Sequence, residues 1–328
     1  MKHLRRILII IAVLLAAIAI WNIAVLAPFY NIAEKTFSQP DIGGKFDEQG
    51  IDYDEESGII FVGGYMKNKE ASPVYLIDQA TNKQIKQVNL LDIDGGPFTG
   101  HSGGLAVSQQ YLYLAGSTDD CLYVYSRDEI LNAEDGADIN CLGTFPCFTS
   151  SEDGVKISFV SICDDVLYVG EFHLPLLPFY KLRANHKITT AQGTTSAIMA
   201  AFRLDENGVF GLSSQPFAVY CLPDMVQGVI VNDSEVILSL SFGPFPSTIA
   251  SYEAVEAGSY ELMNAETKLY SLQKISSMVV IPMSEEIVEI NGKLYISSEL
   301  YNMICPAFGN LWDSQYCYAI PSDCVRSE

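Results

Sequence analysis

The sequence predicts an all-β protein, a β-propeller for which five blades are favoured and six are the alternative, preceded by an N-terminal transmembrane helix. Three observations lead to this prediction. A pair of short strands joined by a polar turn recurs five times along the chain, and each pair is followed by further strand-like segments. Apolar residues make up 49% of the 328 residues, yet helical apolar stripes are hard to find after residue 35. Repeated units of four antiparallel strands are typical of propeller blades.

The N-terminal segment combines a basic start with a long apolar run. Lys2, Arg5 and Arg6 precede Ile7–Tyr30, which contains no charged residue. As a helix this run extends over roughly 36 Å, enough for a bilayer core of about 30 Å, and it exceeds the apolar region of about 7–15 residues usual in a cleaved signal peptide. A cleaved signal remains the alternative. We therefore expect a single-pass protein of the cell membrane with its C-terminal domain extracytoplasmic, divided into a cytoplasmic basic flank (1–6), an anchor (7–30), a linker (31–39) and the propeller domain (40–328).

The five strand pairs share one pattern of residue types, although their amino-acid sequences differ. Each has small or polar residues, a short alternating strand, a polar turn and a second strand that ends in a small residue, and Asn291-Gly292 is the clearest of the hairpin turns. The five segments begin at Gln49, Gly103, Ser158, Gln227 and Glu285. This recurrence sets the number of units at five, and the long third unit leaves room for a sixth.

Each pair is followed by a third strand, and four of the pairs also by a fourth. We expect third strands at 72–83, 121–130, 197–208, 247–254 and 315–322. Fourth strands include 83–91 and 215–224. The last unit has no fourth strand before the chain ends at Glu328, so residues 36–46 are expected to supply it and close the ring. A β-sandwich with coincidental internal similarity is the alternative.

Two stretches carry a resemblance to a known class. "QGIDYDEESGIIFVGGY" from Gln49 and "VYLIDQATNKQIKQVNL" from Val74 give a strand pair, then an Ile-Asp and a polar turn. On these stretches the chain resembles bacterial extracytoplasmic β-propellers of the broad YVTN/NHL-like kind, over residues 46–322. Such propellers serve as binding proteins, lactonases, lyases and scaffolds, so the resemblance implies a fold and leaves the function open.

The charge balance is strongly acidic. Lys and Arg total 19 against 40 Asp and Glu, a formal net charge of −21. Such a surface repels nucleic-acid phosphates, which excludes nucleic acid as a partner. It suits cations, cationic partners or neutral ligands, and simple solubility of an exported protein explains it equally well.

All eight cysteines lie after residue 120, in the part expected outside the membrane. We expect at least two of them in a disulfide bond, within the C-terminal group Cys305, Cys317 and Cys324, where a staple would hold the end of the ring. Buried free thiols are the alternative. The chain contains no C-x-x-C, so zinc-ribbon and thioredoxin-like sites have no support.

Gly100-His101-Ser102-Gly103-Gly104 matches the G-x-S-x-G pattern of serine hydrolases. A nucleophile elbow requires a helix after the serine, whereas the following residues alternate with a period of two, as in a strand. Ser102 is therefore not predicted to be a nucleophile. Gly103 and Gly104 are better explained by close backbone approach near the propeller axis.

The starts of the first strands should meet at one mouth of the central channel. We expect a ligand funnel there, flanked by two residues of the third unit's insertion. The predicted ligand-binding residues are Gln49, His101, Gln227 and Glu285, with Glu171 and His186 beside them. Glu285 and Glu286 should point to opposite faces of their strand, and a carboxylate beside the histidine should raise the histidine pKa.

Metals and functions stay open at this stage. Carboxylates such as Glu171, Glu285 and Glu299 could hold calcium, although no loop matches an EF-hand. His101, His173 and His186 could hold a transition metal. Calcium is the cofactor that the sequence allows, and none is certain. The favoured function is non-enzymatic binding of an unknown small molecule or envelope protein at the funnel. The alternatives are a calcium-dependent lactonase/arylesterase-like hydrolase, whose Glu/Asn/Asp set this chain lacks, and a structural envelope module.

Overall fold

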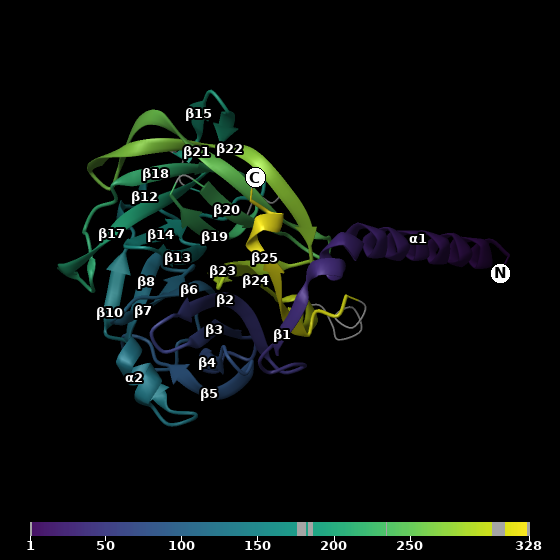
Figure 1. Cartoon of the computed structure of the whole chain (residues 1–328), viewed down its shortest axis with the longest axis horizontal. Coiled ribbons are helices and arrows are strands. Elements are labelled where there is room, and N and C mark those ends of the chain that lie inside the picture. Colours follow the sequence, from purple (N-terminus) through teal and green to yellow (C-terminus); the bar gives the residue numbers. More distant parts are fainter. Residues whose placement is uncertain (1, 176–181, 183–185, 234, 304–311, 327–328) are drawn as a thin grey trace.

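The computed structural model describes residues 2–175, 182, 186–233, 235–303 and 312–326, with few of the side chains in the first half of the N-terminal helix. Within these residues the all-β prediction is confirmed. The α-helices are α1 (Lys2–Ile32), α2 (Arg127–Asn132) and α3 (Leu300–Met303), and the strands make up the body from which α1 projects (Figure 1).

The strands pair in sequence order within each repeated unit. The first sheet contains β2 (Phe46–Asp54), β3 (Ile59–Met66), β4 (Pro73–Asp78) and β5 (Lys83–Leu90), with β9 (Asp138–Ile139) added parallel to β5. The second contains β6 (Ser102–Val107), β7 (Tyr111–Gly116), β8 (Cys121–Ser126) and β10 (Gly143–Pro146). Each first strand begins within a few residues of its predicted start.

The third and fourth units share one eight-stranded sheet. The third contributes β13 (Phe159–Cys163), β14 (Val166–Gly170), β17 (Ala197–Val209) and β18 (Ala218–Leu222). The fourth contributes β19 (Val226–Asn232), β20 (Glu235–Leu240), β21 (Ser247–Leu262) and β22 (Ala265–Val280). The outer strands β18 and β22 pair in parallel, because the long β21–β22 hairpin extends past its own unit to reach its neighbour. Two short hairpins lie between units, β11 (Phe148–Ser150) with β12 (Asp153–Gly154) and β15 (Ile188–Thr190) with β16 (Gly193–Thr195).

The last sheet joins the two ends of the chain. It contains β23 (Ser284–Ile290), β24 (Lys293–Ser298) and β25 (Tyr316–Pro321), and β1 (Glu34–Ser38) pairs antiparallel with β25 as its fourth strand. An N-terminal strand therefore closes the last unit, as expected, although it begins two residues before the predicted range 36–46 and ends at Ser38, inside that range. Within residues 31–39, expected to form a linker, α1 ends at Ile32 and β1 begins at Glu34.

The first strands pack against one another in a closed cycle. β2 contacts β6, β6 contacts β13, β13 contacts β19, β19 contacts β23, and β23 returns to β2. Figure 1 shows the sheets arranged around this inner group of strands. Apolar side chains fill the spaces between neighbouring sheets, for example Val74 and Leu76 of the first sheet against Leu112 and Leu114 of the second. Sheets radiating from a ring of inner strands define a β-propeller.

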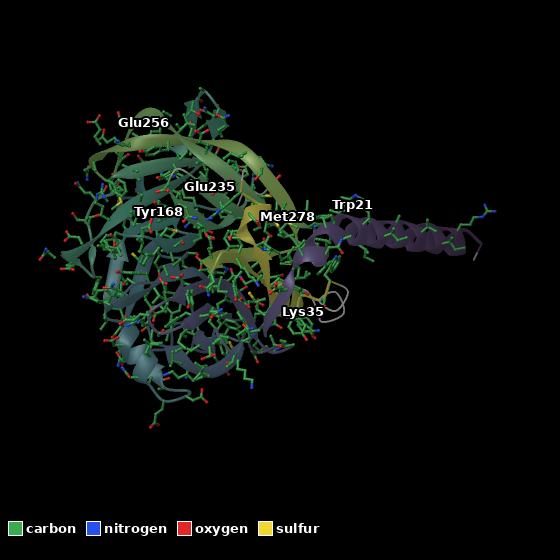
Figure 2. The ribbon with its side chains drawn as sticks, in the orientation of Figure 1. Trp21, Lys35, Tyr168, Glu235, Glu256 and Met278 are labelled. Atoms are coloured by element: carbon green, nitrogen blue, oxygen red, sulfur yellow. The ribbon has the colours of Figure 1, made fainter. Side chains whose placement is uncertain are left out.

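α1 is docked on the body at its C-terminal end. Leu26 and Phe29 are fully buried, and the Phe29 ring lies 5.4 Å from that of Tyr318 in β25. Trp21, one turn earlier, is exposed on the projecting part of the helix (Figure 2). Among the described residues, no helix combines the length and the apolar character that a membrane crossing requires.

The expected C-terminal disulfide is not formed. Cys317 is buried in β25 and Cys324 is exposed, and both are free thiols, as are the other described cysteines. Cys317 faces the apolar core between the last and first sheets, which places it away from the surface where a staple could form. Cys305 lies outside the described residues.

Candidate functional site

Two amide–carboxyl pairs bridge neighbouring units at the end of the ring where first strands begin and second strands end. Gln49 Nε2 donates a hydrogen bond of 2.8 Å to Glu299 Oε2, and Gln227 Nε2 donates one of 3.1 Å to Glu285 Oε1. Gln49 and Glu285 are buried, whereas Gln227 and Glu299 are half-buried. We call this end, with the residues that surround these pairs, the axial mouth.

Tyr65 and His101 stand at the rim of the axial mouth. Their rings lie 4.7 Å apart, and Tyr65 lies close enough to Asp47, Glu299 and Glu285 for these carboxyls to raise its pKa in addition to the effect of burial. His101 departs from expectation: burial lowers its pKa, and nearby Asp47 only partly opposes this. The predicted rise is wrong because desolvation of the imidazolium outweighs the attraction of one carboxylate, which Lys67 Nζ already contacts at 2.9 Å.

The carboxyls of the axial mouth hold their protons at unusually high pH. Burial, with help from Asp47, raises the pKa of Glu299 to about 7, and burial raises that of Glu48 to about 8. The pKa of Glu285 is raised well above its usual value by burial and by the neighbouring Glu299 and Glu286. Close carboxyls in a poorly solvated site cannot all ionise, so the mouth carries both protonated and ionised carboxyls near neutral pH.

Glu286 fills the axis below the mouth. Its Oε2 accepts hydrogen bonds from the backbone N–H groups of Ile51 (3.0 Å) and Leu105 (3.1 Å), and the Val160 amide also favours its charged form. One side chain of the last unit thus joins the inner strands of the first three. A Cβ on Gly104 would lie 2.5 Å from Glu286 Oε1, which confirms that this glycine permits close approach at the axis.

Burial raises the pKa of Glu286 well above its usual value, so burial outweighs the amides that favour the anion. Glu285 and Glu286 contact different partners, as expected for adjacent strand residues. Both are buried, and the strand register is irregular between Ser284 and Ile287. Glu286 is therefore part of the scaffold under the mouth.

Glu171 and His186 form a separate pair. His186 Nδ1 lies 2.8 Å from the Glu171 carboxylate, which also accepts hydrogen bonds from the amides of Lys156 (2.8 Å) and Ile198 (3.0 Å). Both side chains are fully buried, and Glu171 directly follows β14, at the end of the ring where the second strands end. Four of the six predicted residues are thus brought together around Glu299 and Tyr65, and the other two are paired with each other.

The sequence also raised a serine nucleophile and a metal site as possibilities. Ser102 opens β6 with its side chain buried, and no described histidine contacts it, in keeping with a strand position. No group of three or more His, Cys, Asp or Glu residues in the described part of the chain is arranged to hold a metal ion. His173 instead pairs with Asp224, its Nδ1 2.5 Å from Oδ1, at the edge of a cavity of about 430 Å³.

A second cavity, at the other end of the ring, was not predicted from the sequence. A cavity of about 990 Å³ opens at the opposite end of the ring, where the turns between first and second strands lie. These turns carry acidic and polar pairs such as Glu55-Glu56, Gln109-Gln110 and Asp164-Asp165. The polar residues that recur in these turns could have indicated a site, but polar residues are also common in hairpin turns without a binding function.

Comparisons with known proteins identify no family. No protein-family profile matches the chain, and no curated protein matches it. Among solved structures, glutaminyl cyclase from Myxococcus xanthus is similar at 9% identity, with a TM-score of 0.44, over 88% of this chain and 94% of that one.

Two other solved structures are similar at the same level. The PQQ-bound aldose sugar dehydrogenase from Streptomyces coelicolor has 14% identity and a TM-score of 0.44 over 82% of this chain and 78% of that one. BamB from Moraxella catarrhalis has 8% identity and a TM-score of 0.36 over 90% and 98%. The propeller class assigned here follows from the cyclic strand packing of the chain itself.

Proposed function

We propose that the chain is a non-enzymatic binding protein, a five-bladed propeller that takes up a small, neutral, polar ligand at the axial mouth. Each of the five repeated units counts as one blade, and the strand cycle supports this number. The observation that carries the proposal is the bridging of two blade junctions by the Gln49–Glu299 and Gln227–Glu285 pairs, directly beside the Tyr65–His101 rings.

The mixture of hydrogen-bond donors and acceptors at the axial mouth favours a neutral ligand. A protonated carboxyl donates one hydrogen bond and accepts others, a carboxamide does both, and a neutral imidazole has one donor and one acceptor. Hydroxyl or amide groups of a ligand match such a mixed set, and the Tyr65–His101 pair offers an apolar face beside it. A fully ionised cluster would instead select cations.

The proposal is tested by screening the full chain against neutral sugars and small amides by isothermal titration calorimetry at pH 6. A hit should weaken at least tenfold in Glu299→Ala and in Tyr65→Ala, whereas Glu299→Gln, which keeps a neutral donor–acceptor group, should retain most of the affinity. Glu152→Gln, an exposed acidic site on the β11–β12 turn, serves as the matched control. No binding across the panel, or binding unaffected by both alanine variants, would contradict the proposal.

We also propose that residues 7–30 anchor the protein in the cell membrane, with the propeller outside. The uncharged run from Ile7 to Tyr30 and the basic flank before it support this, as does an exposed Trp21 ahead of the buried end of α1. Because β1 follows α1 almost directly, the anchor would hold the propeller close to the bilayer. Intact-mass measurement of membrane-extracted protein should give the full chain, and a mature chain that begins near residue 28 would contradict an uncleaved anchor.

A further inference from the structure

We propose that the cavity at the end of the ring opposite the axial mouth is a second binding site, for a small organic cation that bears primary ammonium groups on an aliphatic chain. The cavity of about 990 Å³ lies between the hairpin turns of the first three units and the C-terminal half of β17. Its walls come from residues 53–56, 107–111, 162–165 and 203–206, together with Tyr113 and Gly211. This volume is at the upper end of the range of about 300–1,000 Å³ for small-molecule sites.

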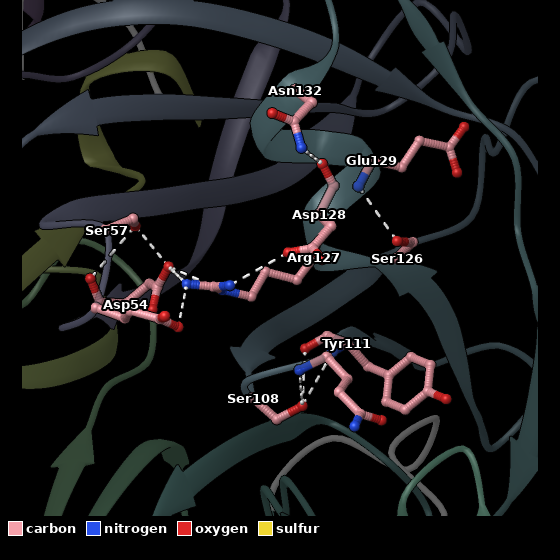
Figure 3. A network of polar contacts seen from close by, with 11 residues as sticks. Asp54, Ser57, Ser108, Tyr111, Ser126, Arg127, Asp128, Glu129 and Asn132 are labelled. Carbon is pink, nitrogen blue, oxygen red and sulfur yellow. Dashed lines mark hydrogen bonds and ion pairs between the residues drawn. The ribbon is translucent and has the colours of Figure 1, made fainter.

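Behind one wall of the cavity, a buried arginine contacts carboxylates of the first hairpin turn. The buried Arg127 guanidinium contacts Asp54 Oδ2 through Nε (2.9 Å) and Nη2 (2.7 Å), and Nη2 also lies 3.0 Å from Glu56 Oε2. Figure 3 shows Arg127 reaching from the start of α2 toward Asp54 and Ser57, with Ser108 and Tyr111 nearby. Ser126 caps α2 by accepting a hydrogen bond from the Glu129 amide at 3.2 Å, which fixes the base of Arg127. These contacts hold the wall in place and balance the charge of Asp54, whereas Glu56 leaves the wall with a negative charge.

The remaining acidic side chains of the lining outnumber the cations. The exposed carboxylates are Glu55, Asp164, Asp165, Asp205 and Glu206. Among the lining residues the cation is Arg203, whose guanidinium lies over the Phe217 ring at 4.2 Å from its centroid. Carboxylates that line one concave surface add their fields at its centre, which favours a positively charged ligand there.

Aromatic and aliphatic groups give the cavity an apolar component that a simple acidic surface lacks. The rings of Tyr111 and Tyr113 lie 6.1 Å apart, and Tyr113 donates a hydrogen bond of 2.8 Å to the Phe210 carbonyl, which holds its orientation. Tyr53, Ile162 and Leu204 also belong to the lining. Ring faces attract ammonium groups, and aliphatic side chains accommodate methylene stems.

Size and donor arrangement argue against a bare metal ion at this place. A single ion would occupy a small fraction of about 990 Å³, and no described group of His, Cys, Asp or Glu is arranged for metal coordination. An extended amine can instead contact carboxylates on separate turns while its stem covers the tyrosine rings. A free polyamine and a lysine side chain of a peptide share this chemistry.

The test is titration of the full chain with spermidine by isothermal titration calorimetry at low ionic strength. Asp164→Asn/Asp165→Asn should weaken spermidine binding about tenfold, because two ammonium–carboxylate contacts are lost. Asp94→Asn/Glu152→Gln removes the same charge from exposed sites outside the cavity and should change affinity less than twofold. Tyr111→Leu should weaken binding, whereas Tyr111→Phe should not.

A competition experiment distinguishes a free polyamine from a lysine side chain of a peptide as the ligand. A lysine-rich peptide competing better than spermidine would identify a peptide side chain as the guest, and weaker competition would identify the free amine. Absence of spermidine binding, or equal losses in the cavity and control double variants, would overturn the proposal, because non-specific attraction to a chain of net charge −21 would then suffice.

Discussion

The two ends of the ring both carry several carboxyl groups, but in different environments. At the axial mouth Asp47, Glu48 and Glu285 are buried, and burial is the largest cause of the raised pKa values of Glu48, Glu285 and Glu299. In the opposite cavity the carboxylates of the turns, such as Asp164 and Asp165, are exposed to water. Burial, more than the number of acidic residues, therefore decides which end is close to neutral and which is anionic.

The largest effect is expected at the wall of the cavity that Arg127 holds in place. Arg127→Met leaves the buried Asp54 carboxylate without its partner and should lower the free energy of unfolding by about 3–5 kcal/mol. Urea unfolding of the full chain measures this. Asp54→Asn in the Arg127→Met background should recover part of the loss, and a loss below about 1 kcal/mol in the single variant would show that the ion pair does not hold this wall.

The next effect is expected at the axis. Glu286→Ala removes the acceptor for the Ile51 and Leu105 amides and leaves a void, which should cost about 3 kcal/mol of unfolding free energy. Glu286→Gln keeps an acceptor of the same shape without charge and should cost about 1 kcal/mol at pH 6. Equal losses in both variants would indicate that Glu286 is ionised in the folded chain.

The pH dependence of stability should reflect the buried carboxyls. Because their pKa values are raised on folding, their contribution is fully present below the unfolded values near 4 and is lost as pH rises through about 7 to 8. Unfolding free energy measured in urea should therefore fall by ~2 kcal/mol or more between pH 5 and pH 9. Surface repulsion adds to this trend, so the control is Glu48→Gln/Glu299→Gln, which should flatten the slope; an unchanged slope would assign the effect to the surface.

The smallest effect is expected from the exposed turn of the cavity. Asp164→Asn should change stability by less than about 0.5 kcal/mol at any pH, because asparagine tolerates the positive φ of 52° and water already solvates the carboxylate. Thermal unfolding at pH 5 and 8 measures it. A large change would mean that this turn belongs to the folding core, as the mouth carboxyls do.

Sequence reasoning captured the repeat because each unit keeps the same strand alternation and turn chemistry. It placed the five first strands, the N-terminal closing strand and the convergence of Gln49, His101, Gln227 and Glu285. It did not predict the contact between Glu171 and His186, because the insertion that contains His186 has no counterpart in the other units. It also gave His101 the wrong direction of pKa change. The balance between desolvation and the attraction of Asp47 depends on how deeply each side chain is buried, and a sequence pattern does not give that depth.

The opposite cavity escaped prediction for a related reason. Its walls combine turns from three units with the end of β17, which continues past its partner strand, and the length of β17 is not encoded by the repeat. Arg127 was likewise unmarked, because a single arginine at a helix start gives no sign that it will be buried against Asp54.

The central claim is that burial keeps the mouth carboxyls protonated near neutral pH while the cavity carboxylates are charged. It is tested most directly by carbon-13 NMR titration of the full chain labelled at Glu and Asp side-chain carboxyls. The account predicts a small set of glutamate resonances that titrate at about pH 7 to 8, one of which disappears in Glu48→Gln and another in Glu299→Gln. If every glutamate titrates below pH 5.5, or if neither substitution removes a resonance that titrates near neutral pH, the account is wrong.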